Sequence, residues 1–278
     1  MNKKPYWITQ NLQSIPTSLE SDHFLFYTYD QVENGKSPLG NLGRDIIYGF
    51  IIQKMSPFKE VWIFPKDTLD SKISHRVADI FSLAMRIKCD LALSKPGEIF
   101  YNKKNLPVEP QPPNLLSFEN ICFSSKLETK EAEKSFIMAK ILSSHCSYNK
   151  YFFQFNYLKE LRCTDPYLGY LGLWSFIEIE WADDNKKANI KNSLKKLLIA
   201  WANGDRELKK DFTIRLDRIS KKVGENFNEY SIRNLLAHGK YHIARSNWKT
   251  EDVKEFHYIH NELFKIMFSV LEERIINA

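Results

Sequence analysis

The sequence lacks the long apolar stretch that a membrane-spanning helix requires. Its longest run without a charged side chain is Pro5–Leu19, only 15 residues and rich in Gln, Ser, Thr and Asn, whereas a span needs about 20 mostly apolar residues. Lys3 and Lys4 near the start are not followed by the apolar segment of a secretory signal. We therefore expect a cytoplasmic protein that makes no use of a membrane.

Cysteine is also scarce, and the familiar motifs for nucleotide binding and for serine hydrolysis are missing. The four cysteines are Cys89, Cys122, Cys146 and Cys163, and none forms a CxxC pair. A chain of 278 residues with 43% hydrophobic residues can form its core without disulfides and is not disordered throughout. We expect free, mostly buried thiols, no cofactor and no metal centre, and we find no P-loop, no GxGxxG and no Ser–His–Asp pattern.

The charge is unevenly distributed. The net charge is +6, and residues 185–222 alone carry 12 basic and 4 acidic side chains. A local excess of this size attracts polyanions such as RNA. A solvated helix face would have the same composition, so both interpretations stay open at this point.

The first part of the chain reads as a small α+β domain, residues 1–106. Short β-branched or aromatic runs between turn residues predict strands at Phe24–Tyr29, Ile46–Ile52 and Val61–Phe64, and a helical period covers Ser71–Ser94. Residues 107–128 read as a proline-rich linker, because four prolines between Pro107 and Pro113 exclude a helix and a central strand. Within it, residues 118–124 are a candidate further strand.

Residues 129–278 are predicted to be all helical. Asp165 followed by Pro166 marks a helix start, with Asp165 as the N-cap. The short loops favour an up-and-down bundle. On the helix that follows Asp165 we expect one apolar stripe of Leu168, Leu171, Trp174, Ile177 and Trp181. The predicted helices begin near Thr129 and cover 150–161, 167–182, 190–202, 206–223, 227–237 and 250–276.

One cluster gathers groups that could do chemistry: Arg233-Asn234-Leu-Leu-Ala-His238-Gly239. On a helix, Ile232, Leu235 and Leu236 fall on the arc that faces the core. Arg233, Asn234, Ala237 and His238 fall on the opposite arc. Gly239 then stands where a helix ends in a left-handed residue.

This trio suits the cleavage of a phosphodiester without a metal. An imidazole titrates near neutral pH, so His238 can take a proton from an attacking 2′-hydroxyl or give one to the departing 5′-oxygen. The guanidinium of Arg233 can donate to the phosphoryl oxygens on which negative charge develops, and Asn234 can orient the reacting groups. The simpler interpretation is that Arg233 forms a salt bridge and His238 caps the helix.

Arg233-Asn234-x3-His238-Gly239, on the penultimate helix of a helical half, resembles the Rx4–6H signature of HEPN domains. The helix Tyr167–Glu178 is similar to the opening helices of the Apea-like HEPN group. The resemblance covers roughly residues 130–278 by architecture and implies a bundle that dimerises and joins two Arg/His pairs in one cleft. It therefore implies a metal-independent endoribonuclease of defence or toxin systems, with Arg233 and His238 catalytic and Asn234 supporting them.

Two other functions fit the same residues. One is a non-catalytic module that dimerises and binds RNA or a nucleotide, and the other is a toxin held by an antitoxin or regulatory partner encoded elsewhere. In the ribonuclease interpretation, residues 1–106 would sense a trigger, recruit substrate or hold the nuclease inactive. In the antitoxin interpretation, the N-terminal half would mainly be an interaction surface. In HEPN toxins that are paired with a nucleotidyltransferase, a Tyr stands two positions after the His. Here Lys240 stands there, which argues against control by adenylylation.

Further candidates surround the motif. Lys240, Tyr241 and His242 could contact RNA or simply form an exposed loop. Glu178 could pair with Arg233. His238 and His242 have the spacing of metal ligands on a helix, but Gly239 breaks that geometry and no third ligand is evident.

Overall fold

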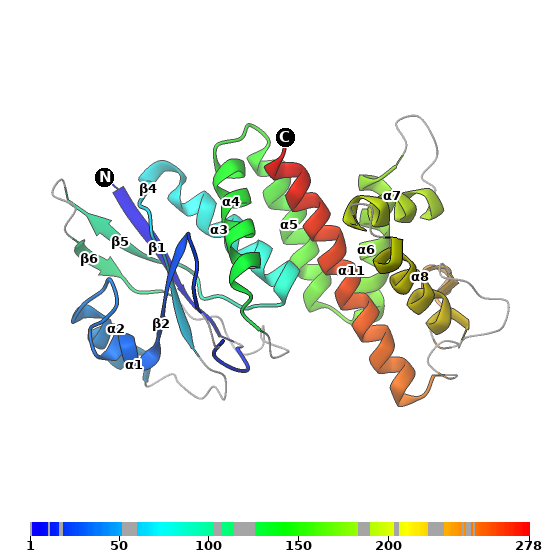
Figure 1. Cartoon of the computed structure of the whole chain (residues 1–278), viewed down its shortest axis with the longest axis horizontal. Coiled ribbons are helices and arrows are strands. Elements are labelled where there is room, and N and C mark those ends of the chain that lie inside the picture. The colour runs from blue at the N-terminus through cyan, green and yellow to red at the C-terminus, as the bar shows by residue number, and fades with distance from the viewer. Residues whose placement is uncertain are drawn as a thin grey trace. The chain divides into compact units, whose positions relative to one another are not determined.

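The computed structural model describes residues 2–10, 12–16, 19–51, 60–102, 107–113, 126–182, 190–202, 206–221, 231–240, 242, 246 and 248–278. The chain forms two compact units, residues 1–156 together with Ala278, and residues 157–277. Figure 1 shows the elements of both units. Within the described residues, no helix is long and apolar enough to cross a bilayer.

The first unit is built on an antiparallel β-sheet. Its described strands lie in the order β2-β3-β1-β5-β6, and β4 pairs with β1. Each pairing is antiparallel. The strands are β1 (Asn2–Ile8), β2 (Phe24–Thr28), β3 (Val61–Pro65), β4 (Leu69–Asp70), β5 (Gly97–Tyr101) and β6 (Pro107–Gln111).

Helices cover both faces of this sheet. Successive side chains of β1 point to opposite faces, and large apolar residues on both faces need a partner to pack against. Tyr6 joins a buried cluster that contains Val32 and Ile47 from the first two helices. Trp7 packs on the other face against Phe81 of the third helix, with 4.7 Å between ring centroids. The helices of this unit are α1 (Tyr29–Glu33), α2 (Leu42–Ile51), α3 (Ser71–Cys89), α4 (Thr129–Ser143) and the first part of α5 (Tyr148–Cys163).

Most of the elements predicted in the first unit are confirmed, and one is wrong. Strands β2 and β3 and helix α3 lie where the sequence predicts them. The run Ile46–Ile52, predicted as a strand, belongs to helix α2. The helix begins before Ile46, at Leu42, and its burial follows a helical period. Gly43 and Ile47, four positions apart, are buried, while Arg44 and Asp45 between them are exposed.

The proline-rich segment contributes to the sheet. Pro107–Gln111 forms β6, which pairs with β5 at one end of the strand order. Prolines are tolerated there because an edge strand leaves one side of its backbone unpaired. The candidate strand at residues 118–124 lies outside the described residues.

The cysteines differ from expectation in their burial. None of the described ones forms a disulfide, as predicted. However, Cys89 is half-buried and Cys146 and Cys163 are exposed, so the expectation of mostly buried thiols is wrong for these three. Cys146 lies in the turn between α4 and α5 and Cys163 ends α5, and both places are near the surface.

The second unit consists of helices. Its longest helix, α11, contacts α6, α7 and α8, and α9 packs on α6. The predicted N-cap is confirmed, since the Asp165 carboxylate accepts hydrogen bonds from the backbone amides of Tyr167 and Leu168. Beyond the end of α5, the helices are α6 (Pro166–Glu180), α7 (Ile190–Ala202), α8 (Arg206–Lys221), α9 (Ser231–Ala237) and α11 (Thr250–Ile276).

The face that α6 buries is not the predicted stripe. Trp174, Ile177 and Trp181 are buried, but Leu171 is only half-buried and Leu168 is 62% exposed. Apolar residues occur all around this helix, so their spacing does not select one face. The structure buries Gly169, Tyr170, Leu173, Trp174, Phe176 and Ile177.

His260 of α11 is enclosed in the core of this unit. It is 4% exposed, and its ring lies 5.0 Å from that of Phe264. A Cβ at Gly169 would come within 2.5 Å of the Leu161 carbonyl oxygen and 3.1 Å of the His260 Nε2, so the backbone of α5 leaves room only for glycine here. Burial, the guanidinium of Arg162 and the ring of His257 lower the pKa of His260 to about 3.

We predict that His260 makes stability depend on pH. The unfolded chain binds a proton on this imidazole below about pH 6.5, and the folded chain does so only near pH 3. The free energy of unfolding should therefore decrease as the pH is lowered through that window, by about 1.4 kcal/mol per pH unit. Urea unfolding between pH 7.5 and pH 4 should show a shallower pH slope for His260→Leu. His145→Leu, at an exposed position, should keep the wild-type slope. Equal slopes for wild type and His260→Leu would contradict the prediction.

Candidate functional site

Helix α9 presents the Arg–His motif as its helical period predicts. Ile232 and Leu235 are buried, with 1% and 9% exposure. On the other side Asn234, Ala237 and His238 are exposed. The predicted division into a core arc and an outward arc is therefore confirmed for these residues, whereas Leu236, predicted on the core arc, and Arg233, predicted on the outward arc, are both half-buried.

The end of α9 has the geometry that Gly239 was predicted to provide. Gly239 has a φ of 67°, in the left-handed region. Its backbone amide donates to the carbonyl of Leu236 at 3.0 Å, and the amide of Lys240 donates to the carbonyl of Leu235 at 2.8 Å. This pair of bonds is the Schellman ending of a helix. It stops the helix directly after His238 and leaves the imidazole at the tip.

Arg233 is held by a carboxylate from another helix. Its Nη2 donates to both carboxylate oxygens of Glu178 on α6, at 3.0 and 2.9 Å. The hypothesis that these two residues pair is thus confirmed. The guanidinium is only partly accessible, because the Arg233 side chain is 21% exposed. Its Nη1 lies 3.5 Å from the Oδ1 of Asn234.

The structure therefore brings part of the predicted site together. Arg233, Asn234 and Glu178 form one group, whereas His238 stands one helical turn further along. Within the described residues, the His238 imidazole has no hydrogen-bond partner. The exposed imidazole at the helix tip is accessible to a ligand, and a guanidinium can bind an anion.

The residues after the motif are only partly described. Lys240 and His242 are exposed, and Tyr241 lies outside the described residues. The described part of the chain contains no group of three or more His, Cys, Asp or Glu side chains that could hold a metal ion. Lys240 and His242 are therefore accessible to a ligand, and their role in binding RNA stays a prediction.

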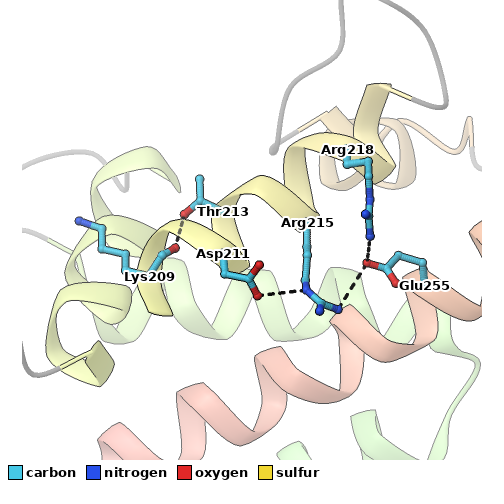
Figure 2. A network of polar contacts seen from close by, with 6 residues as sticks. All are labelled: Lys209, Asp211, Thr213, Arg215, Arg218 and Glu255. Carbon is cyan, nitrogen blue, oxygen red and sulfur yellow. Dashed lines mark hydrogen bonds and ion pairs between the residues drawn. The ribbon is translucent and has the colours of Figure 1, made fainter. Parts of the chain in front are cut away.

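Part of the basic excess is neutralised within the unit, as Figure 2 shows for α8 and α11. Glu255 of α11 accepts from Arg218 at 2.6 Å and lies 3.7 Å from Arg215. Arg215 also donates to Asp211 at 3.2 Å, and its guanidinium lies 4.9 Å from the ring of Tyr258. These arginines fasten α8 to α11, so they contribute less positive potential than the sequence indicates.

One feature near the site is missed by the sequence reasoning. Leu168 and Ile179 of α6 are 62% and 75% exposed. They are 11 positions apart, which is about three helical turns, so they lie on the same face. The sequence did contain a sign of this exposed face. Apolar residues occur all around α6, more than the core of the unit can bury, so some of them must lie at the surface.

Comparison of the chain with protein-family models, with curated proteins and with solved structures gave no match in any of the three.

We predict that Gly239 is needed for the local geometry of the tip. A Cβ at this position meets nothing within 4 Å, so Gly239→Ala should cost only the backbone strain, about 1 kcal/mol. Gly239→Asn should cost less, because Asn adopts left-handed angles more readily. Faster hydrogen exchange of the Lys240 amide would report the fraying. Equal exchange in wild type and Gly239→Ala would contradict the assigned role.

Proposed function

We propose that this chain is a metal-independent endoribonuclease of the HEPN type, a defence or toxin effector whose site is completed by a second copy. The observation that carries the proposal is the exposed His238 imidazole at the end of α9, the short helix that also carries the Arg233 guanidinium held by Glu178. If Arg233 only formed a salt bridge and His238 only capped the helix, nothing would require the two side chains to lie on the same side of α9. A phosphodiester-cleaving site does require them there.

The chemistry follows from the two groups. The imidazole removes the proton from a ribose 2′-hydroxyl, and the 2′-oxygen forms a bond to the adjacent phosphorus. The bond from phosphorus to the 5′-oxygen breaks, and that oxygen takes up a proton. The products are a 2′,3′-cyclic phosphate and a 5′-hydroxyl. Arg233 donates hydrogen bonds to the phosphoryl oxygens, whose negative charge increases in the transition state.

A second copy of the chain supplies the missing proton donor. One imidazole that acts as base cannot at the same moment protonate the leaving oxygen. Two His238 side chains at a shared cleft can act as base and acid together. This division of labour is the chemical reason for proposing a homodimer.

The exposed stripe of α6 is suited to contact the same stripe of a second copy. Leu168 and Ile179 are apolar, and the hydroxyl of Ser175 between them donates to the carbonyl of Leu171 at 3.2 Å. The neighbouring Glu178 is neutralised by Arg233, so two identical faces can meet without like-charge repulsion. RNA would favour a surface with net positive charge instead. We therefore assign the stripe to the isologous contact of two copies.

The positive charge for RNA comes from the remaining cations. Lys195, Lys210 and Lys240 are exposed in the described structure. Lysines bind the phosphate backbone without selecting a sequence. They can supply the affinity for RNA while the α9 tip supplies the chemistry.

We predict that purified wild-type protein cleaves single-stranded RNA in the presence of EDTA and leaves 2′,3′-cyclic phosphate ends. Arg233→Ala and His238→Ala should each lower the cleavage rate by about 100-fold or more, because each removes a group that acts in the transition state. The ends can be identified by their conversion with polynucleotide kinase. Expression of the wild type, but not of the variants, should slow bacterial growth.

Matched controls separate a site effect from a general one. Arg274→Ala breaks an ion pair with Glu180 of α6, and His145→Ala removes an exposed imidazole, so both should cleave like wild type. RNA binding without cleavage would favour the non-catalytic module. Cleavage that disappears with EDTA would overturn the metal-free mechanism.

We further predict that Ile179→Glu dissociates the dimer. The substitution places two carboxylates at the proposed contact, where they repel each other. Sedimentation analysis should show a dimer for wild type and a monomer for Ile179→Glu, with unchanged circular dichroism. Ile214→Glu on α8, where the original side chain is 52% exposed, should remain dimeric. A monomeric wild type, or a dimeric Ile179→Glu, would contradict the assignment.

A further inference from the structure

The contact between Glu178 and Arg233 differs from a second ion pair that α6 forms in the described structure. Glu178 and Arg233 have side-chain exposures of 13% and 21%, and both carboxylate oxygens accept from the same nitrogen. Glu180 pairs with Arg274 through one oxygen at 2.5 Å, and the side chains of Glu180 and Arg274 are 21% and 47% exposed. An exposed pair contributes little to orientation, whereas a largely enclosed two-oxygen pair restricts the guanidinium.

The remaining nitrogens of Arg233 show what this restriction achieves. Its Nε is buried without a hydrogen-bond partner in the described structure. Both bonds to Glu178 come from Nη2, and Nη1 has only the long contact with Asn234. One side of the guanidinium is therefore anchored to α6, and Nη1 retains a donor for a ligand. A free arginine would spread over many rotamers.

The pair also alters the charge at the site. Beside the Glu178 carboxylate, Arg233 adds almost no net charge that would attract a resting phosphodiester. A fixed hydrogen-bond donor stabilises the phosphoryl oxygens most strongly when they gain negative charge, which happens in the transition state. An interaction made mainly in the transition state raises kcat, whereas one made equally with the bound substrate lowers KM.

We propose that Glu178 is a positioning residue: it fixes the Arg233 guanidinium for transition-state stabilisation and gives up attraction for the substrate. This inference rests on the proposed ribonuclease function. It assigns a role to a residue 55 positions away from the Arg–His motif and outside it. Glu178 acts through Arg233 and does not contact the RNA itself.

The test is the steady-state kinetics of Glu178→Gln on single-stranded RNA. Gln keeps the shape and one acceptor but removes the charge and adds a donor that faces Nη2. We expect kcat to fall on the order of 10- to 100-fold. KM should stay equal or fall, because the freed guanidinium attracts phosphate more strongly. Glu178→Asp, which keeps the charge, should recover part of kcat.

Glu180→Gln is the matched control, because it removes the charge of the exposed pair on the same helix. It should keep the wild-type kcat and KM. A second measurement reports the position of Arg233 directly. In NMR spectra of the guanidinium, the wild type should show slow rotation of the Arg233 Nη groups, and Glu178→Gln should show fast rotation.

Two results would overturn the inference while leaving the ribonuclease proposal intact. One is a Glu178→Gln protein with the wild-type kcat, with or without a lower KM, since the carboxylate would then only compete with phosphate. The other is fast rotation of the Arg233 Nη groups already in the wild type. If wild-type protein cleaves no RNA, the proposed function fails and the assigned role fails with it. The three failures are therefore distinguishable.

Discussion

The ion pair between Arg233 and Glu178 is the contact on which the site depends. It joins α9, a short helix that could not be stable alone, to α6, which is anchored in the core through Trp174 and Tyr170. Because Ile232 and Leu235 are buried beneath it, α9 is held from its apolar side as well. The position of α9 is thereby fixed relative to the other helices of the second unit, and His238 lies at the end of a well-anchored helix.

The fold explains why the tip is open. Gly239 ends α9 immediately after His238, and the His238 side chain is exposed. The core of the unit is completed by α11, whose buried His260 lies in an aromatic environment. The two histidines thus illustrate opposite uses of one side chain. His260 is kept neutral by burial, and His238 is left in solvent, where it can exchange protons.

Features that depend on residues close together in the sequence could be predicted from it, and features that depend on distant residues could not. The cap at Asp165 follows from short-range hydrogen bonds and is confirmed. The outward arc of α9 follows from helical spacing and is confirmed at Asn234, Ala237 and His238, while Arg233 is half-buried. Helix α2 was misread because the apolar run Ile46–Ile52 has strand-like composition, while the burial pattern that decides it begins upstream. The exposed face of α6 could not be chosen, since every side of that helix is apolar. The pairing of Arg233 with Glu178 bridges 55 positions, so the sequence could suggest it but not its geometry.

The central claim is that two α9 tips act on one phosphate. The most direct measurement is a crystal structure of the protein in complex with RNA that carries 2′-O-methyl groups, which cannot attack the phosphorus. The account predicts two copies with their α9 tips at one cleft, and a phosphate within hydrogen-bond distance of an Arg233 guanidinium and a His238 imidazole. RNA bound elsewhere, or two tips on opposite sides of the assembly, would contradict it.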